Sequence, residues 1–322
     1  MNRKTVPLAV ALAAIAASIA MPVAAAPPTV RASVLTDGTL RISGSPLANT
    51  IVLRVSATDR TQLQVDVGDD GTADETFDLN TFRAIDVEAG NGNDTVTIDQ
   101  ANGIFTTSKA TRIDGGNGDD TLIGGSGNEI FVGGRGRDLV DGNGGADTAF
   151  LGKGNDTFVW DPGDGSDVVE GQAGSDTLVF NGSGGNEIMA ATAIFGRVAF
   201  TRNLGTIVMD LDGIEAIDVN ALGGTDTVTV NDLSGTDVQR VDVDLAGALG
   251  GSTADGQADT VTVTATKGDD EIDADAHRAA VEVSGLAAFV RITHADPASD
   301  KLIIDTVAGA DDVSLDPALA AC

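Results

Sequence analysis

The chain has 322 residues, a formal net charge of −30 and 42% hydrophobic side chains. So large a negative charge makes nucleic acid and anionic membranes poor partners, because cationic surfaces bind both of them. Ten Phe, one Trp and no Tyr suit a thin core better than a bulky globular one, and a single cysteine, Cys322, excludes a disulfide framework within the chain.

The first 25 residues have the composition of a secretory signal peptide. Arg3 and Lys4 form a basic start, residues 6–21 form an apolar stretch, and residues 23–25 form a small-residue cleavage site. The apolar stretch is shorter than the ~20 residues that a membrane span needs. We therefore predict cleavage of residues 1–25, a secreted or extracellular location and no membrane span. Cleavage leaves 49 acidic against 17 basic side chains.

Residues 26–82 are predicted to form an N-terminal region of β-strands. Apolar and β-branched residues alternate over 39–42, 50–55 and 63–67, and Asp-Gly pairs at 37–38 and 70–71 indicate turns. Residues 69–75 contain part of an EF-hand loop pattern, without its full ligand spacing or helical flanks. We expect them to form a turn rather than an independent metal site.

A strand–turn–strand pattern follows and recurs further along the chain. AIDVEAGNGNDTVTI at 84–98 reappears as AIDVNALGGTDTVTV at 216–230, with degenerate versions at 259–264, 267–274 and 303–316. Apolar residues alternate through each copy, which predicts stacked rungs. Asp94 lies in a nearly complete glycine frame and is predicted to bind a metal ion. Asp226 and Asp312 lack part of that frame and are predicted mainly to close turns.

Residues 115–179 contain seven units of the nine-residue template G-G-x-G-x-D-x-U-x, in which U is a large apolar residue. Glycine permits the positive φ angles of a sharp turn, and turn carbonyls and carboxylates are the oxygen ligands that calcium takes. The sixth residues are Asp120, Glu129, Asp138, Asp147, Asp156, Asp167 and Asp176. The eighth residues should point inward, since side chains alternate along a strand: Leu122, Phe131, Val140, Ala149, Phe158, Val169 and Leu178.

This template is a sequence signature of calcium-binding parallel β-helices, and the region resembles the repeats-in-toxin (RTX, haemolysin-type) calcium-binding family. The resemblance implies an all-β fold, a right-handed parallel β-roll or β-helix (a solenoid), with two nonapeptides per coil and several Ca²⁺ per chain. It implies two columns of sites, one with Asp120, Asp138, Asp156 and Asp176 and the other with Glu129, Asp147 and Asp167. It further implies carbonyl ligands from the first four turn residues, among them Gly115, Asn117, Gly124, Ser126, Gly133, Arg135, Gly142, Gly144, Leu151 and Lys153.

The repeats depart from the template at two places. Glu129 is one methylene longer than Asp, and the two-residue insert Trp160-Asp161 is expected to break the count between Asp156 and Asp167. We therefore expect about four or five well-formed calcium sites rather than one for each carboxylate.

Residues 181–212 are predicted to form further strands rather than a linker, because apolar residues alternate over 197–200 and 206–211. The predicted organisation is a signal peptide (1–25), an N-terminal β-strand region (26–82), a calcium-binding β-roll (83–180) and a C-terminal region of degenerate rungs (181–322).

The predicted function is that of a secreted calcium-binding protein without an enzymatic activity. G-x-S-x-G, H-E-x-x-H and phosphate-loop motifs are absent from the sequence. We expect structural calcium and a cell-surface or extracellular structural or adhesion role, with cell-surface or matrix components as partners. The alternative is a calcium-dependent, polysaccharide-acting lyase or epimerase on a β-helix. The amino-terminal leader departs from the family's usual export route, so the resemblance transfers calcium binding and fold but not toxin activity.

Overall fold

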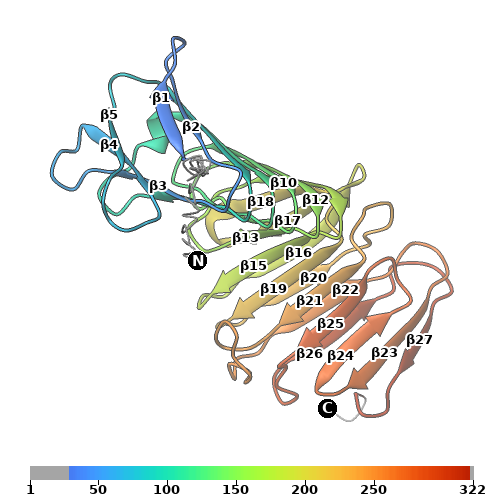
Figure 1. Cartoon of the computed structure of the whole chain (residues 1–322). Helices are drawn as coiled ribbons and strands as arrows, with labels where there is room; N and C mark the ends of the chain where they lie inside the picture. The colour runs from blue at the N-terminus through green and yellow to red at the C-terminus, as the bar shows by residue number, and fades with distance from the viewer. Residues whose placement is uncertain (1–28, 320–322) are drawn as a thin grey trace, which may run out of the picture.

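A computed structural model describes residues 29–319. The predicted signal peptide and Cys322 lie outside these residues. The chain forms an elongated stack of strands, with its blue N-terminal part and its red C-terminal part at opposite ends (Figure 1). The strands belong to two sheets of 13 and 14 strands, called here sheet A and sheet B. The prediction of an all-β roll or solenoid is confirmed.

Sheet A contains, in spatial order, β1 (Arg31–Val34), β2 (Thr39–Ser43), β6 (Ala84–Asn91), β8 (Ala110–Asn117), β10 (Glu129–Arg135), β12 (Thr148–Gly154), β14 (Val168–Gly174), β18 (Ile207–Asp212), β17 (Arg197–Arg202), β16 (Ile188–Ile194), β20 (Thr227–Val230), β22 (Thr260–Thr264) and β26 (Lys301–Asp305). Sheet B contains β27 (Asp312–Leu315), β23 (Glu271–His277), β24 (Ala280–Ser284), β25 (Phe289–Thr293), β21 (Arg240–Asp244), β19 (Ala216–Leu222), β15 (Thr177–Ser183), β13 (Thr157–Trp160), β11 (Leu139–Asp141), β9 (Thr121–Ile123), β7 (Thr95–Asp99), β3 (Thr50–Val55), β4 (Gln62–Val67) and β5 (Glu75–Asp78). Two short 3-10 turns are η1 (Thr106–Ser108) and η2 (Leu204–Thr206).

Successive nonapeptides alternate between the two sheets. Leu122 in β9 pairs in parallel with Val140 in β11, and Phe131 in β10 pairs with Ala149 in β12. Each partner is therefore two units away in the sequence. One coil of the roll consists of two nonapeptides, as predicted.

The core lies between the inner faces of the two sheets. All seven of the predicted inward residues are at most 1% exposed, from Leu122 to Leu178. One apolar residue per nonapeptide, large in every unit except that of Ala149, is buried at this position, because only every second side chain of a short strand faces inward. Burial of each such side chain contributes roughly 1.5–3 kcal/mol.

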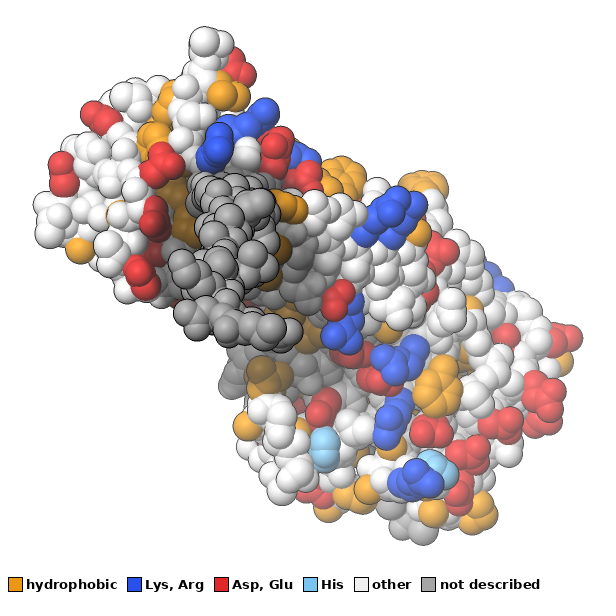
Figure 2. Space-filling view, viewed as in Figure 1, with side chains coloured by type: hydrophobic (Ala, Val, Ile, Leu, Met, Phe, Trp, Pro, Cys, Tyr) orange, Lys and Arg blue, Asp and Glu red, His pale blue; other side chains and the backbone are white. Residues whose placement is uncertain are grey.

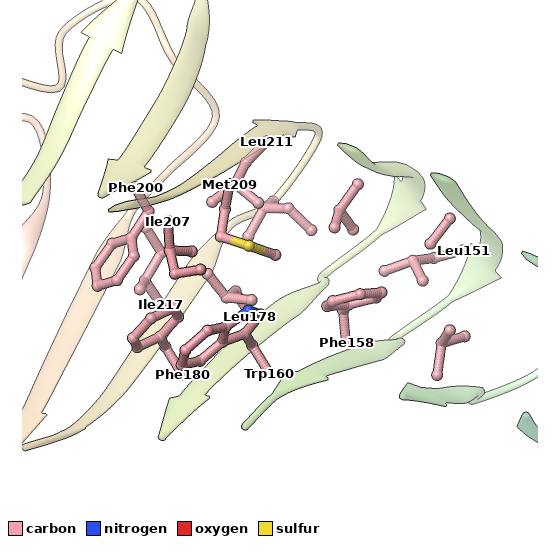
Figure 3. Close-up of a cluster of buried hydrophobic side chains, with 14 of the residues drawn as sticks. Leu151, Phe158, Trp160, Leu178, Phe180, Phe200, Ile207, Met209, Leu211 and Ile217 are labelled. Carbon is pink, nitrogen blue, oxygen red and sulfur yellow. The ribbon is translucent and has the colours of Figure 1, made fainter. Parts of the chain in front are cut away.

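The Trp160-Asp161 insert lengthens one coil, so the nine-residue count is broken there as predicted, but the stack of coils is not interrupted. Trp160 is completely buried and lies in register with Phe180 on the next coil, with ring centroids 4.1 Å apart and planes 1° from parallel. The Phe200 ring packs against Phe180 as well, with ring centroids 4.6 Å apart and planes at 51° to each other (Figure 3). The extra residues therefore widen the core locally, and the adjacent units remain aligned.

Residues 181–212 form strands, as predicted, but their order is unexpected. β16, β17 and β18 make an antiparallel meander, and β18 rather than β16 pairs with β14 of the roll. β16 in turn pairs in parallel with β20, so sheet A continues beyond the meander. A second antiparallel meander, β23–β24–β25, lies in sheet B.

The sheets run through the predicted domain boundaries. β2 pairs in parallel with β6, and β15 pairs in parallel with β19, so strands on both sides of residues 82 and 180 share one stack. The division into separate regions stays a prediction.

The surface carries many acidic side chains. Figure 2 shows them scattered over the visible face and gathered at the C-terminal end. Within residues 29–319, no helix is long and apolar enough to cross a bilayer.

Candidate metal centre

The turns between the strands stack on one another through glycine. Gly116 and Gly118 have φ angles of +101° and +127°, a region that other residues adopt only with strain. A Cβ atom added to Gly134 would lie 2.2 Å from the carbonyl oxygen of Gly116 on the preceding coil. The glycine template therefore permits both the sharp turn and the close contact of stacked backbones.

The sixth residues form two columns, one on each edge of the roll. The main-chain N–H of every column member except the last donates to a carboxylate oxygen of the next coil, at 2.7–2.9 Å. The B column, which precedes strands of sheet B, contains Asp94, Asp120, Asp138, Asp156 and Asp176. The A column, which precedes strands of sheet A, contains Glu129, Asp147 and Asp167. These bonds span 18 residues within the repeats, 20 across the insert and 26 between Asp94 and Asp120, so both columns continue past Trp160.

Each column carboxylate keeps a second oxygen that is buried and unpartnered. Within the described chain, no hydrogen-bond donor reaches Oδ2 of the column aspartates or Oε1 of Glu129. The side chains are at most 2% exposed. A Cβ atom on Gly115 would lie 2.5 Å from Asp120 Oδ2, and one on Gly142 would lie 2.4 Å from Asp147 Oδ2. The free oxygens are therefore directed into their own glycine turns.

Burial raises the pKa of these carboxyl groups, because desolvation disfavours the charged form. The pKa of Asp120 is raised to about 6, that of Asp138 to about 7 and that of Asp147 to about 9, chiefly by burial. Neighbouring carboxylates of the same column add to the effect, whereas the accepted amide bonds oppose it. A cation between the turns would favour the charged form.

The predicted carbonyl ligands line the same turns, although several already accept hydrogen bonds. The carbonyl oxygens of Asn117, Arg135 and Lys153 accept the N–H of Gly92, Gly118 and Gly136, respectively. A carbonyl oxygen has a second lone pair, so these bonds do not prevent coordination. Ser126 lies on the exposed side of its turn, whereas Leu151 has a buried side chain. The assignment of these residues as ligands stays a prediction.

Glu129 begins the A column and lies beside two residues outside the repeat. Its Oε2 accepts the N–H of Gly125 in its own turn at 2.9 Å. Its Oε1, Gln100 Oε1 and Thr106 Oγ1 are all buried, and none makes a hydrogen bond of normal geometry in residues 29–319. Thr106 and Gln100 both lie against Gly125. The extra methylene of Glu129 is therefore accommodated, beside oxygens that the template does not specify.

The same edge continues beyond the β16–β18 meander in a distal column that sequence reasoning missed. It contains Glu187, Asp226, Asp259 and Asp300, joined by the same amide-to-carboxylate bonds. Asp226 was expected mainly to close a turn, but it is 1% exposed and belongs to this column. Asp226 occupies the same place in the copy at 216–230 as Asp94 does in the copy at 84–98, and this correspondence was the sequence signal for it.

The prediction that Asp312 closes a turn is wrong by one residue. The Asp270 N–H donates to Asp311 Oδ1, whereas Asp312 is exposed and begins β27. The inward position two residues after the carboxylate is Val313, which packs against the core, so Asp311 matches the template better.

The B column was also incompletely predicted at its ends, where Asn49 donates to Asp94 and Glu215 accepts from Asp176.

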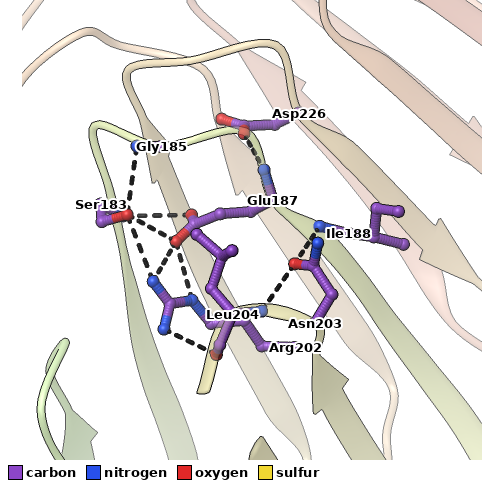
Figure 4. Close-up of polar contacts among 8 residues, drawn as sticks. All are labelled: Ser183, Gly185, Glu187, Ile188, Arg202, Asn203, Leu204 and Asp226. Atoms are coloured by element: carbon purple, nitrogen blue, oxygen red, sulfur yellow. Dashed lines mark hydrogen bonds and ion pairs between the residues drawn. The ribbon is translucent and has the colours of Figure 1, made fainter. Parts of the chain in front are cut away.

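Glu187 is neutralised by an arginine rather than left with a free oxygen. Arg202 from β17 donates to its Oε1 through Nε at 2.7 Å and through a second guanidinium nitrogen, and Ser183 donates to the same carboxylate (Figure 4). Both charged side chains are buried. A buried carboxylate requires a positive or hydrogen-bonding partner, and only this member of the distal column has a guanidinium.

The repeat turns fit calcium by the chemistry of their donors. Calcium prefers about 6–8 oxygen ligands, including carboxylates and main-chain carbonyls, and a buried anionic oxygen without a partner is costly. No group of three or more His, Cys, Asp or Glu side chains in the described part of the chain could hold a metal by itself. Coordination would therefore combine one or two carboxylates with main-chain oxygens.

The sequence profile of the RTX calcium-binding nonapeptide repeat (4 copies) matches residues 106–140, 123–158 and 162–193. The chain carries RTX calcium-binding repeats. The matched RTX repeats include both columns except Asp94, and the matched span ends within the first meander. A search of curated proteins found no match. The RTX repeats imply calcium binding.

Proposed function

We propose that the chain is a secreted protein in which several calcium ions hold the RTX roll together, with a structural or adhesive role at a cell surface or in an extracellular matrix. The observation that carries the proposal is the repeated buried oxygen. In each repeat turn, one carboxylate oxygen accepts an amide bond and the other is unpartnered within residues 29–319. Calcium between the turns supplies the partner that each free oxygen lacks.

Because the turns carry so much negative charge, we expect calcium binding to be coupled to the folding of the roll. Carboxylates on adjacent coils are separated by about 5 Å, the spacing of neighbouring strands, and like charges at that distance repel each other. The apolar core offers one large residue per nonapeptide, and the glycine-rich turns lose much conformational entropy on folding. Calcium reverses the sign of the electrostatic energy, so its binding free energy becomes folding free energy.

Secretion and the surface role rest on the sequence. The basic and apolar leader at residues 1–25 favours export. The acidic, aromatic-poor solenoid favours a scaffold over a sugar-processing cleft, because sugar platforms usually present aromatic faces.

The test compares the mature protein with and without calcium. Calorimetric titration of metal-free protein should give several calcium ions per chain, and a stoichiometry below two contradicts the proposal. Hydrogen exchange should show residues 115–179 unprotected with chelator and protected with calcium, while the Val- and Ile-rich flanking rungs keep part of their protection. Equal protection of residues 115–179 in both conditions would mean that the roll folds without the metal.

A further inference from the structure

Asp226 has a buried carboxylate oxygen without a partner, outside the residues that match the RTX profile. Its Oδ1 accepts the Glu187 N–H at 2.8 Å (Figure 4). Its Oδ2 has no hydrogen-bond partner anywhere in residues 29–319, and the residue is 1% exposed. The preceding turn therefore occupies Oδ1, and Oδ2 alone is left for a cation.

The turn before Asp226 has the backbone shape of an RTX turn, although two of its glycines are missing. Leu222 and Gly224 have φ angles of +67° and +129°. They stand four and two residues before the carboxylate, where Gly116 and Gly118 stand before Asp120. Ala221 and Leu222 occupy the positions of the first two glycines. The sequence departs from the template while the conformation does not.

The next turn brings two more carboxylates to the same place. Asp259 Oδ1 accepts the N–H of Asp226 at 2.8 Å, and Asp255 Oδ2 accepts the N–H of Gly224 at 3.0 Å. No arginine or lysine pairs with any of these three carboxylates in the described residues. Anionic oxygens and turn carbonyls without a cationic side chain are the surroundings that calcium prefers.

Three other turn carboxylates of this half of the molecule are satisfied by the protein itself. Glu187 pairs with Arg202. Both oxygens of Asp270 accept hydrogen bonds from Thr266, and Asp300 accepts the Asp296 N–H at 2.6 Å. Among the distal-column members and Asp270, only Asp226 retains a buried oxygen without a partner.

We propose that the turn of residues 221–226 holds a further calcium ion, with Asp226 Oδ2 as a ligand and the carboxylates of Asp255 and Asp259 beside it. This inference rests on the proposed function, because it extends structural calcium from the RTX roll to the C-terminal rungs. The turn thus serves a binding role that its incomplete glycine frame conceals.

Three variants of the mature full chain test the inference by calcium stoichiometry. Asp226→Asn keeps an oxygen for the Glu187 N–H, removes the charge and should bind one calcium fewer than the wild type. Asp270→Asn, at a turn whose carboxylate is already satisfied, is the matched control and should bind the wild-type number. Asp138→Asn reports on the RTX roll. Wild-type stoichiometry in Asp226→Asn together with a loss in Asp138→Asn overturns this inference alone; fewer than two ions in the wild type overturns the proposed function as well.

Hydrogen exchange in the wild type gives a second test that does not depend on the variant's folding. Calcium should raise the protection of amides at residues 222–227 and at Asp259. In Asp226→Asn, that gain should disappear while the gain over residues 115–179 remains. Protection at residues 222–227 that is the same with calcium and with chelator overturns the inference.

Discussion

The main-chain N–H of Asp138 donates to Oδ1 of Asp156 at 2.8 Å, across 18 residues of sequence. The same carboxylate keeps Oδ2 buried and unpartnered within residues 29–319. One oxygen thus joins adjacent coils and the other is available to a cation. Substitutions that preserve the first role and remove the second separate the two.

Asp138→Asn should lower the number of calcium ions bound per chain by at least one. The amide oxygen of Asn can still accept the N–H of Asp120, which Asp138 accepts at 2.9 Å, but the charge and the free oxygen are lost. Calorimetric titration measures the stoichiometry. Asp312→Asn, at an exposed carboxylate that begins β27, is the control. An unchanged stoichiometry in Asp138→Asn would exclude Asp138 as a ligand.

Gly136→Ala should destabilise the calcium-loaded roll strongly. Gly136 has a φ of +132°, and its added Cβ would lie 2.0 Å from the Gly118 carbonyl oxygen. The conformation alone costs about 1–3 kcal/mol for an L-residue, and the collision requires the stacked coils to separate. Gly144→Ala is the matched control, because its nearest atom is 3.6 Å away. Thermal unfolding in calcium should show a large loss of midpoint temperature only for Gly136→Ala; equal losses would refute the stacking argument.

Acidification should stabilise the metal-free roll and weaken its calcium binding. The folded-state pKa values of Asp138 and Asp147 are raised to about 7 and about 9 from an ordinary value of 3.8. At pH values between 3.8 and these raised pKa values, the folded chain binds more protons than the unfolded chain. The free energy of unfolding therefore falls as pH rises. With chelator, the fluorescence of Trp160, the only tryptophan, should report a larger folded fraction of the roll at pH 5 than at pH 8. With calcium present, the order should reverse, because protons compete for the same oxygens.

Arg202→Met should cost about 3–5 kcal/mol of stability, because it leaves the buried Glu187 carboxylate without its positive partner. Adding Glu187→Gln to that variant should recover part of the loss by removing the unpaired charge. Arg240→Met breaks a half-exposed pair with Asp218 and should cost less than about 1 kcal/mol. Denaturant unfolding compares the three. A loss in Arg202→Met no larger than in Arg240→Met would contradict the role of the pair.

The sequence predicts the roll well because its nine-residue template specifies both the turn and the inward position. Leu122 and Phe131 are buried at the expected places, and the pairing of β9 with β11 follows from the period. The meanders were not predictable in the same way. Apolar residues alternate through β16 and β17 regardless of whether a strand has parallel or antiparallel neighbours, so alternation identifies strands but not their order.

The candidate sites were predicted where glycine marks the turn and missed where another residue adopts the same conformation. Leu222 has a φ of +67° in the turn of Asp226, a conformation that a search for glycine does not find. At Trp160 the sequence pattern is interrupted although the stack of coils is not. Its insert interrupts the nine-residue count, but a buried aromatic stack with Phe180 absorbs the extra residues, because a pair of large rings fills a locally wider core.

The reversed meander β18–β17–β16 separates two groups of acidic turns by more than the electrostatic screening length. Strand β14, which follows Asp167, is separated from β16, which follows Glu187, by β18 and β17. Three strand spacings amount to about 14 Å, which exceeds the screening length of about 8 Å at physiological ionic strength. Arg202 further cancels the charge of Glu187 at the near end of the second group. Occupancy of one group should therefore leave the affinity of the other unchanged, and the solenoid would respond to falling calcium as two independent segments.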